Sequence, residues 1–173
     1  NSRLCMASSV AGHKRAFGED IVPGTYEDLE QADLVVLTGS NLAWCHPILY
    51  RRMTDARTKR GTRLVVIDPR RTQTGEEADL FLGLRPGTDT ALFSGLLVHL
   101  ASTGSLDYRF VLDHTSGFDG ALERARAIAP TIPATAAATY SAASDVARAP
   151  TTSASTAPPK MMLSCTRAER RSA

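Results

Sequence analysis

The sequence predicts an α/β fold, with a parallel sheet and flanking helices. Two apolar runs, residues 34–37 and 64–67, are continuous rather than alternating, as expected for strands buried on both faces of a parallel sheet. An amphipathic stretch from about residue 47 to 59 separates them and predicts a crossover helix. In such a unit both strands end at the same edge of the sheet, where open α/β sheets bind ligands. The expected arrangement is therefore a Rossmann-like parallel sheet with one binding edge.

Local patterns predict the remaining elements. Thr25 and Asp28 have the spacing of a capping box at the start of a helix, and Thr88 is suitably placed to cap another. Residues 72–78 are polar and predict a loop. The expected helices span residues 7–17, 26–32, 89–103, 107–113 and 118–129, with a last helical turn at 141–147 and a third strand at 79–84.

Composition excludes several classes of protein. The net charge of +2 is too small to indicate a nucleic-acid partner, and no apolar run approaches the ~20 residues that span a bilayer. The three cysteines, Cys5, Cys45 and Cys165, are widely spaced without a C-x-x-C pair. They predict neither a disulfide framework nor a cysteine zinc site, and they favour a reducing compartment. The chain opens without an initiator Met or a leader pattern, so we expect it to be internal to a longer protein.

Three polar turns follow the three expected strands, at residues 38–41, 68–72 and 87–89. Gly39 allows close approach of the backbone to a ligand, and Ser40 and Asn41 can cap a helix or hold a polar group. Asp68 can accept hydrogen bonds from a ribose or a base, and the arginines after it can pair with phosphate. Each turn alone is equally consistent with a simple helix start. Together, at equivalent strand ends, they favour a nucleotide-like ligand.

Two cysteine positions are chemically ambiguous. Cys5 directly precedes a small-residue helix start, where a thiolate is favoured and can bind a soft metal. The alternative is an inert buried cysteine beside Met6. Cys45 precedes His46, which suggests a metal or a nucleophile, but no carboxylate lies nearby in the sequence and we interpret the pair as structural.

The order of these motifs resembles the catalytic subunits of assimilatory and periplasmic nitrate reductases. These belong to the dimethyl sulfoxide reductase superfamily, the molybdopterin oxidoreductases. The resemblance begins with the string at residues 1–8 and is weaker from 110 to 146. Its opening is closer to the assimilatory branch, which implies a cytoplasmic location, with the periplasm as the alternative. Between residues 8 and 110, the segments that carry the resemblance are 26–30, 39–41, 46–47, 68–72 and 86–89.

The resemblance implies a molybdenum bis(molybdopterin guanine dinucleotide) cofactor, with Cys5 as the metal ligand and Cys5 and Met6 as the catalytic residues. It implies reduction of nitrate to nitrite, with electrons from a donor protein or domain through a 4Fe-4S cluster whose ligands lie outside this chain. By the same resemblance, the residues that contact the cofactor are Asn1, Cys5, Thr38, Gly39, Ser40, Asn41, Ile67, Asp68, Pro69, Arg70, Arg71, Gly87, Thr88 and Asp89.

Three segments are expected. Residues 1–25 form the molybdenum-ligand segment, and residues 26–148 form part of the α/β domain of a larger molybdopterin oxidoreductase. Residues 149–173 are small and polar, and predict a disordered or non-homologous tail. The isolated chain is expected to be inactive, because several domains hold the cofactor in this family. Two other functions remain open, namely a formate dehydrogenase-type oxidoreductase and a non-catalytic nucleotide-binding module.

Overall fold

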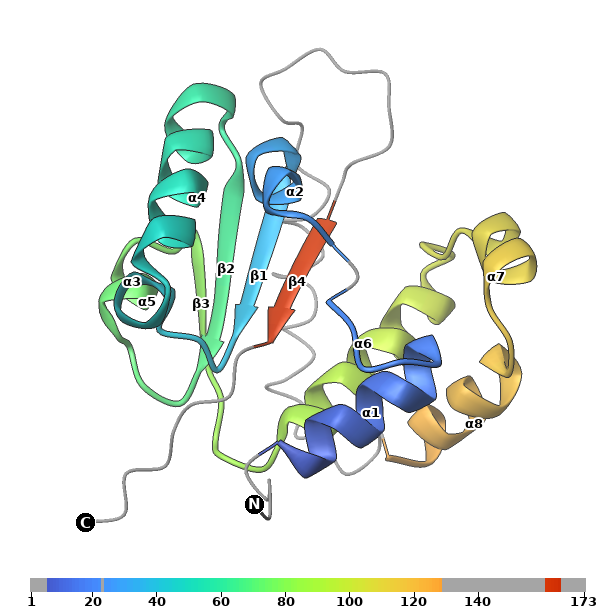
Figure 1. Ribbon diagram of the computed structural model, residues 1–173. Helices are drawn as coiled ribbons and strands as arrows, with labels where there is room; N and C mark the ends of the chain where they lie inside the picture. Colours follow the sequence, from blue (N-terminus) through green and yellow to red (C-terminus); the bar gives the residue numbers. More distant parts are fainter. Residues whose placement is uncertain (1–5, 23, 129–160, 166–173) are drawn as a thin grey trace.

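The protein is described by a computed structural model that covers residues 6–22, 24–128 and 161–165. The four strands point the same way, so their carboxyl ends meet at one edge of the sheet (Figure 1). The strands are β1 (Leu34–Thr38), β2 (Arg63–Asp68), β3 (Leu80–Gly83) and β4 (Met161–Cys165). The helices are α1 (Ala7–Phe17), α2 (Tyr26–Gln31), α3 (Leu42–Cys45), α4 (Pro47–Arg60), α5 (Gln73–Glu76), α6 (Asp89–Ser102), α7 (Tyr108–His114) and α8 (Phe118–Ile128).

The sheet is wholly parallel, in the order β3-β2-β1-β4. Leu34 of β1 lies opposite Arg63 of β2 on one side and Met161 of β4 on the other. The chain therefore places β2 and β3 to one side of β1 and then returns to its other side. In open α/β sheets, the ligand crevice lies outside the carboxyl ends of the strands where the order reverses in this way. The predicted Rossmann-like α/β fold is confirmed, and its topology directs attention to the end of β1.

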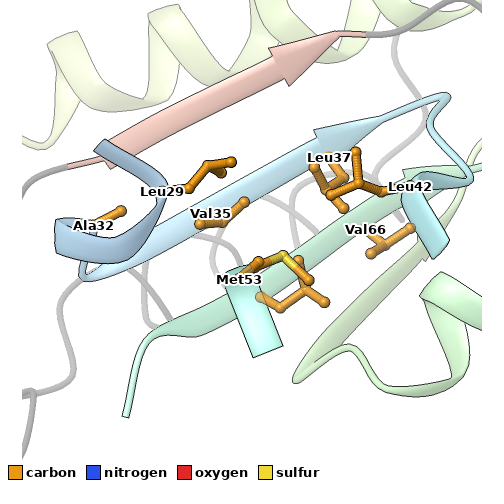
Figure 2. Close-up of a cluster of buried hydrophobic side chains, with 8 residues drawn as sticks. Leu29, Ala32, Val35, Leu37, Leu42, Met53 and Val66 are labelled. Carbon is orange, nitrogen blue, oxygen red and sulfur yellow. The ribbon is translucent and has the colours of Figure 1, made fainter. Parts of the chain in front are cut away.

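Helices cover both faces of the sheet, which explains why its strands are continuously apolar. On one face, Leu29 of α2, Leu42 of α3 and Met53 of α4 pack against Val35 and Leu37 of β1 (Figure 2). On the other face, Leu92 of α6 forms a cluster with Leu34, Val36, Val65 and Ile67. Met53 is completely buried, and burial of a side chain of this size contributes about 1.5 to 3 kcal/mol.

The crossover helix α4 has clear start and stop residues. Pro47 occupies its first turn, where a missing N–H costs nothing. Gly61 ends it in the left-handed conformation, with φ of 74° and an N–H that donates to the Arg57 carbonyl. At α2, the Asp28 carboxylate accepts a hydrogen bond of 2.6 Å from the Thr25 N–H, as the capping-box spacing predicts.

Most predicted elements are confirmed within a residue or two, but three short ones were not anticipated. The α3 and α5 turns have four residues each, too few to show a helical period, and α5 lies where the sequence predicted a loop. The tail was expected to carry no element, yet residues 161–165 form β4. The predicted helical turn at 141–147 lies outside the described residues, and the domain boundaries stay predictions. Within the described ranges, every helix is too short or too polar to cross a bilayer.

Candidate functional site

The turn after β1 combines close backbone contact with two buried hydroxyls. Gly39 has φ of 58°, and its N–H donates to the Ile67 carbonyl at 2.8 Å, which ties the turn to β2. Thr38 is 5% exposed and Ser40 is 1% exposed. Neither hydroxyl oxygen has a hydrogen-bond partner in the described structure. A buried hydroxyl without a partner costs about 1 to 3 kcal/mol, so these two groups are suited to a ligand that supplies the missing hydrogen-bond partners.

Asn41 is held from the side by the α5 helix. The Thr74 hydroxyl donates to Asn41 Oδ1 at 3.0 Å and accepts from the Ala43 N–H at 3.0 Å. One residue further on, Trp44 Nε1 donates to Gln73 Oε1 at 2.8 Å. These three hydrogen bonds, which we call the α3–α5 seam, join the turn after β1 to the turn after β2. Asn41 makes no side-chain capping bond to α3, and its amide oxygen accepts the hydrogen bond from Thr74 instead.

The turn after β2 begins with a buried carboxylate. Asp68 is 5% exposed, and its Oδ1 accepts a hydrogen bond of 2.8 Å from the Arg70 N–H. Pro69, Arg70 and Arg71 are exposed, and the Arg71 guanidinium lies 4.8 Å from the centre of the Phe81 ring. This turn therefore sets an inward acid beside two outward cations.

Ile67 and Thr72 lie at the two ends of the turn after β2. The Ile67 side chain packs in the core on the α6 side, so Ile67 reaches the edge only through its carbonyl. The Thr72 hydroxyl is a third buried oxygen without a partner.

The turn before α6 is more open. Gly87 has φ of 84° and is exposed, as is Asp89, the first residue of α6. Thr88 is the N-cap residue of α6, as predicted, but its side chain makes no capping bond, because its hydroxyl donates to the Arg85 carbonyl at 2.7 Å. The Leu84 N–H donates to the Asp68 carbonyl at 3.4 Å, which keeps the start of this segment against the end of β2.

The three predicted turns thus share one edge of the sheet. β1 pairs with β2 and β2 pairs with β3 in parallel, so Asn41, Asp68 and Asp89 all follow carboxyl ends of adjacent strands (Figure 1). Asn1 and Cys5 lie outside the described residues, and Met6 is half exposed just before α1. Among the described residues, no three His, Cys, Asp or Glu side chains gather as a metal site would require.

Sequence reasoning missed the residues that support this edge. Thr74 is fully buried, yet nothing near it in the sequence reveals that it contacts Asn41, which precedes it by 33 residues. Gln73 and Trp44 were likewise overlooked, because their contact depends on the two unpredicted turns, α3 and α5. Thr72 ends a motif that was recognised, and only its burial distinguishes it.

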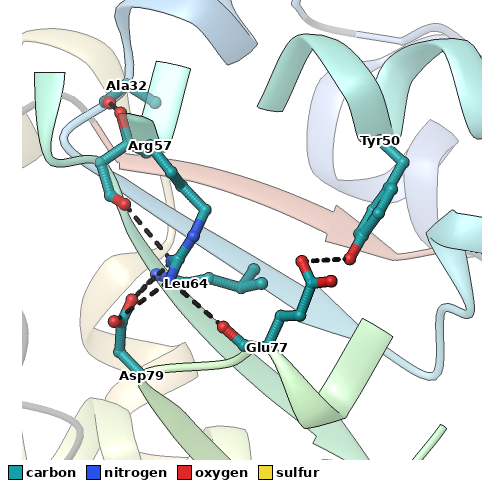
Figure 3. A network of polar contacts seen from close by, with 7 residues as sticks. Ala32, Tyr50, Arg57, Leu64, Glu77 and Asp79 are labelled. Carbon is teal, nitrogen blue, oxygen red and sulfur yellow. Dashed lines mark hydrogen bonds and ion pairs between the residues drawn. The ribbon is translucent and has the colours of Figure 1, made fainter. Parts of the chain in front are cut away.

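The opposite edge of the sheet holds a polar network of another kind (Figure 3). Arg57 of α4 donates to both carboxylate oxygens of Asp79, at 2.6 and 3.2 Å, and to the carbonyls of Thr62 and Glu77. Asp79 also accepts a hydrogen bond of 2.6 Å from the Leu64 N–H. Burial by itself raises the pKa of Asp79, but these hydrogen bonds and the nearby arginine charges outweigh it and hold the pKa below its usual value.

A second contact lies beside this network. The Tyr50 hydroxyl donates to a Glu77 carboxylate oxygen at 2.5 Å. Burial of the phenol, followed by the hydrogen bond and the charge of Glu77, raises the pKa of Tyr50 to about 12. The phenol is therefore protonated throughout the physiological range and acts as a fixed donor.

Comparisons with known proteins agree with this geometry. Residues 1–154 match the profile of a family described as molybdopterin oxidoreductase. A nitrate reductase from Shewanella frigidimarina is 53% identical over 119 residues, which cover 69% of this chain and 13% of that protein. A nitrate reductase from Klebsiella oxytoca is 56% identical over 111 residues, which cover 64% of this chain and 13% of that protein. The chain thus spans about 13% of the length of both relatives.

Other similarities are more distant. The F420-dependent formate dehydrogenase 1 subunit alpha of Methanococcus maripaludis is 36% identical over 118 residues, which cover 68% of this chain and 17% of that subunit. The solved structure of acetylene hydratase from Pelobacter acetylenicus matches with a TM-score of 0.68 and 24% identity, over 92% of this chain and 21% of that one. This structural match concerns the fold alone.

Proposed function

We propose that this chain, which belongs to the molybdopterin oxidoreductase family, works as part of a molybdenum-dependent nitrate reductase. The family resemblance seen in the sequence is thereby confirmed. The proposal for nitrate as substrate is supported by two relatives of that name at 53% and 56% identity. We further propose a cytoplasmic enzyme of nitrate assimilation, because the first eight residues resemble the assimilatory branch.

The observation that carries the cofactor assignment is the pair of unpartnered hydroxyls at the end of β1. Thr38 and Ser40 are both more than nine-tenths buried, and each can donate one hydrogen bond to a phosphate oxygen. Gly39, between them, has a positive φ and no side chain, which leaves room for a ligand to approach the backbone. The chemistry of this edge fits the dinucleotide arm of a molybdopterin guanine dinucleotide.

The remaining residues of the edge have complementary roles in this proposal. Asp68 presents a buried carboxylate, the group that pairs best with the N–H donors of guanine or with ribose hydroxyls. Arg70 and Arg71 are exposed cations that can neutralise phosphate charge. The open turn of Gly87, Thr88 and Asp89 would border the nucleotide end, with Pro69 and the Ile67 carbonyl beneath it.

The chemical step belongs to the cofactor, whereas this chain binds and orients it. The bound molybdenum centre supplies the chemistry by which nitrate loses one oxygen atom, as water, on taking up two electrons and two protons. Cys5 is proposed as the thiolate ligand of the metal, with Met6 beside it, and Asn1 as a cofactor contact. Electrons are proposed to arrive from a donor protein or domain through a 4Fe-4S cluster that is ligated outside this chain.

The proposal has two parts, Cys5 as the metal ligand and the end of β1 as the site of the dinucleotide arm. Variants of the full-length enzyme that carries this segment test them separately. Cys5→Ser should abolish nitrate reduction with a reduced viologen dye while the enzyme stays folded. A Thr38→Val/Ser40→Ala double variant should purify with less molybdenum and less guanine nucleotide, because two donors to the cofactor are gone. Ser102→Ala is the matched control, since its hydroxyl only bonds the His99 carbonyl at the far end of α6. Normal activity of Cys5→Ser, or full cofactor in the double variant, would refute the corresponding half.

The second candidate is formate oxidation, favoured by the 36% identity to a formate dehydrogenase subunit. The same purified enzyme distinguishes the two activities when it is offered nitrate with reduced dye and formate with oxidised dye. A third possibility, a nucleotide-binding module without catalysis, predicts purified enzyme that contains no molybdenum.

A further inference from the structure

We infer that Thr74 is a positioning residue, which fixes the Asn41 carboxamide with its NH2 group turned toward the ligand. This inference rests on the proposed binding of a phosphate-bearing nucleotide at the end of β1, and it adds to that proposal the residue that sets the polarity of the site. The Thr74 hydroxyl is fully buried on α5 and is already bonded to Ala43 and Asn41, so its effect must pass through Asn41.

The hydrogen-bond pattern around Thr74 determines which way Asn41 faces. A hydroxyl has one hydrogen to donate and two lone pairs to accept. The Ala43 N–H can only donate, and it occupies one lone pair of Thr74 Oγ1 at 3.0 Å. The hydroxyl hydrogen is then free to donate, and the acceptor 3.0 Å away is Asn41 Oδ1.

The reversed amide would leave a buried hydrogen without an acceptor. If Asn41 turned its NH2 group to Thr74, two donors would point at the hydroxyl and its own hydrogen would lose its partner. Burial makes such a loss costly, because no water reaches a side chain that is completely covered. The observed orientation is therefore the one that satisfies both the Thr74 hydroxyl and Asn41 Oδ1.

The consequence is an edge lined by donors. With Oδ1 occupied, Asn41 offers its two N–H groups, and the same stretch of chain carries the Ser40 and Thr38 hydroxyls, which have no partner of their own. Such a set recognises acceptors, and phosphate oxygens are the strongest acceptors of a dinucleotide. A third hydrogen bond of the seam, from Trp44 to Gln73 on the surface, also joins α3 to α5.

The test compares Thr74→Val with Thr74→Ser in the 173-residue chain, with GDP as the probe. Nuclear magnetic resonance follows the Asn41 side-chain NH2 signals, the exchange of the Ala43 N–H with solvent, and the affinity for GDP. Thr74→Val should move the NH2 signals toward their positions in a free Asn side chain, expose the Ala43 N–H and weaken GDP binding about fivefold to tenfold, the scale of one net hydrogen bond. Thr74→Ser should restore all three properties.

Two further variants keep the test decisive. Thr62→Val removes a buried threonine hydroxyl from the opposite edge, where it donates to the Ala32 carbonyl at 2.8 Å, and should leave GDP affinity unchanged. Asn41→Asp keeps an acceptor for Thr74 but replaces the outward donors by negative charge. It should preserve the Ala43 protection and weaken GDP binding more than Thr74→Val does.

The possible outcomes are distinguishable. Unchanged Asn41 signals in Thr74→Val, or equal GDP affinity in Thr74→Val and the wild type, would overturn the positioning role and leave the proposed function intact. Failure of the wild-type chain to bind GDP would overturn the ligand-facing role of Asn41 in this chain, whereas the proposed function is tested separately in the full-length enzyme.

Discussion

The two edges of the sheet differ in how their polar side chains are satisfied. At the amino edge, Arg57, Asp79 and Thr62 find their partners within the chain. At the carboxyl edge, the hydroxyls of Thr38, Ser40 and Thr72 have none. Among the described residues, the one other buried side-chain atom without a partner is Arg63 Nε, at the start of β2.

This difference separates groups that stabilise the fold from groups that await a ligand. A satisfied polar group adds to the free energy of unfolding, and its removal weakens the fold. An unsatisfied buried group does the reverse until a ligand binds it, so binding explains the three hydroxyls of the carboxyl edge better than stability does. The comparison can be tested by substitutions that remove polar groups from each edge.

The largest effect is expected for Arg57→Met at the amino edge. This change removes the donors to Asp79, Thr62 and Glu77 and leaves a partly buried carboxylate without its cation. Because the pair is partly exposed to solvent, we expect the free energy of unfolding to fall by about 1 to 2 kcal/mol. Urea denaturation measures it, with Arg51→Met on the exposed side of the same helix as the control. A loss equal to that of the control would remove the distinction between the two edges.

A Thr→Val substitution should change the free energy of unfolding in different directions at the two edges. Thr62→Val breaks the hydrogen bond to the Ala32 carbonyl and should lower the free energy of unfolding by about 1 kcal/mol. Thr38→Val removes a hydroxyl without a partner and should leave stability unchanged or raise it by up to about 1 kcal/mol. Thermal unfolding of both variants of the free chain decides the matter. Equal destabilisation would mean that the Thr38 hydroxyl already has a partner.

The smallest effect concerns Tyr50, between the two edges. Its pKa of about 12 in the folded chain lies above the ordinary value of about 10, so its contribution to stability is complete below pH 10. That contribution is lost as the pH rises from about 10 to 12, because ionisation is easier in the unfolded chain. Tyr50→Phe should remove this loss and the last tyrosinate phase in an absorbance titration. A tyrosinate titration that is complete near pH 10 in the wild type would contradict it.

The sequence could predict the elements that carry their own boundaries. Pro47 and Gly61 mark the two ends of α4, and the continuous apolar runs of β1 and β2 are long enough to identify buried strands. The parallel pairing then placed Asn41 and Asp68 at one edge without any structural information.

What escaped prediction depends on contacts between distant residues. The single turns α3 and α5 exist because their side chains bond to each other, through Thr74 and Gln73, and neither shows a period of its own. The strand β4 is a five-residue run within a polar tail, and it gains its partners only from β1. Thr88 was assigned a capping role from spacing alone, whereas the real geometry offers its hydroxyl the nearer Arg85 carbonyl.

The position of β4 also sets the order in which the sheet can assemble. Leu34 meets Arg63 across a short loop of chain but meets Met161 only after most of the sequence has been synthesised. Closing the longer loop costs about 1 kcal/mol more entropy, and contacts of high sequence separation form late. During folding, β1 is therefore first an open strand edge, with the segment of Thr38 and Ser40 at its end. Within this sheet, the pairing of β4 with β1 is expected to form after that of β2, beside the strand end where the cofactor is proposed to bind.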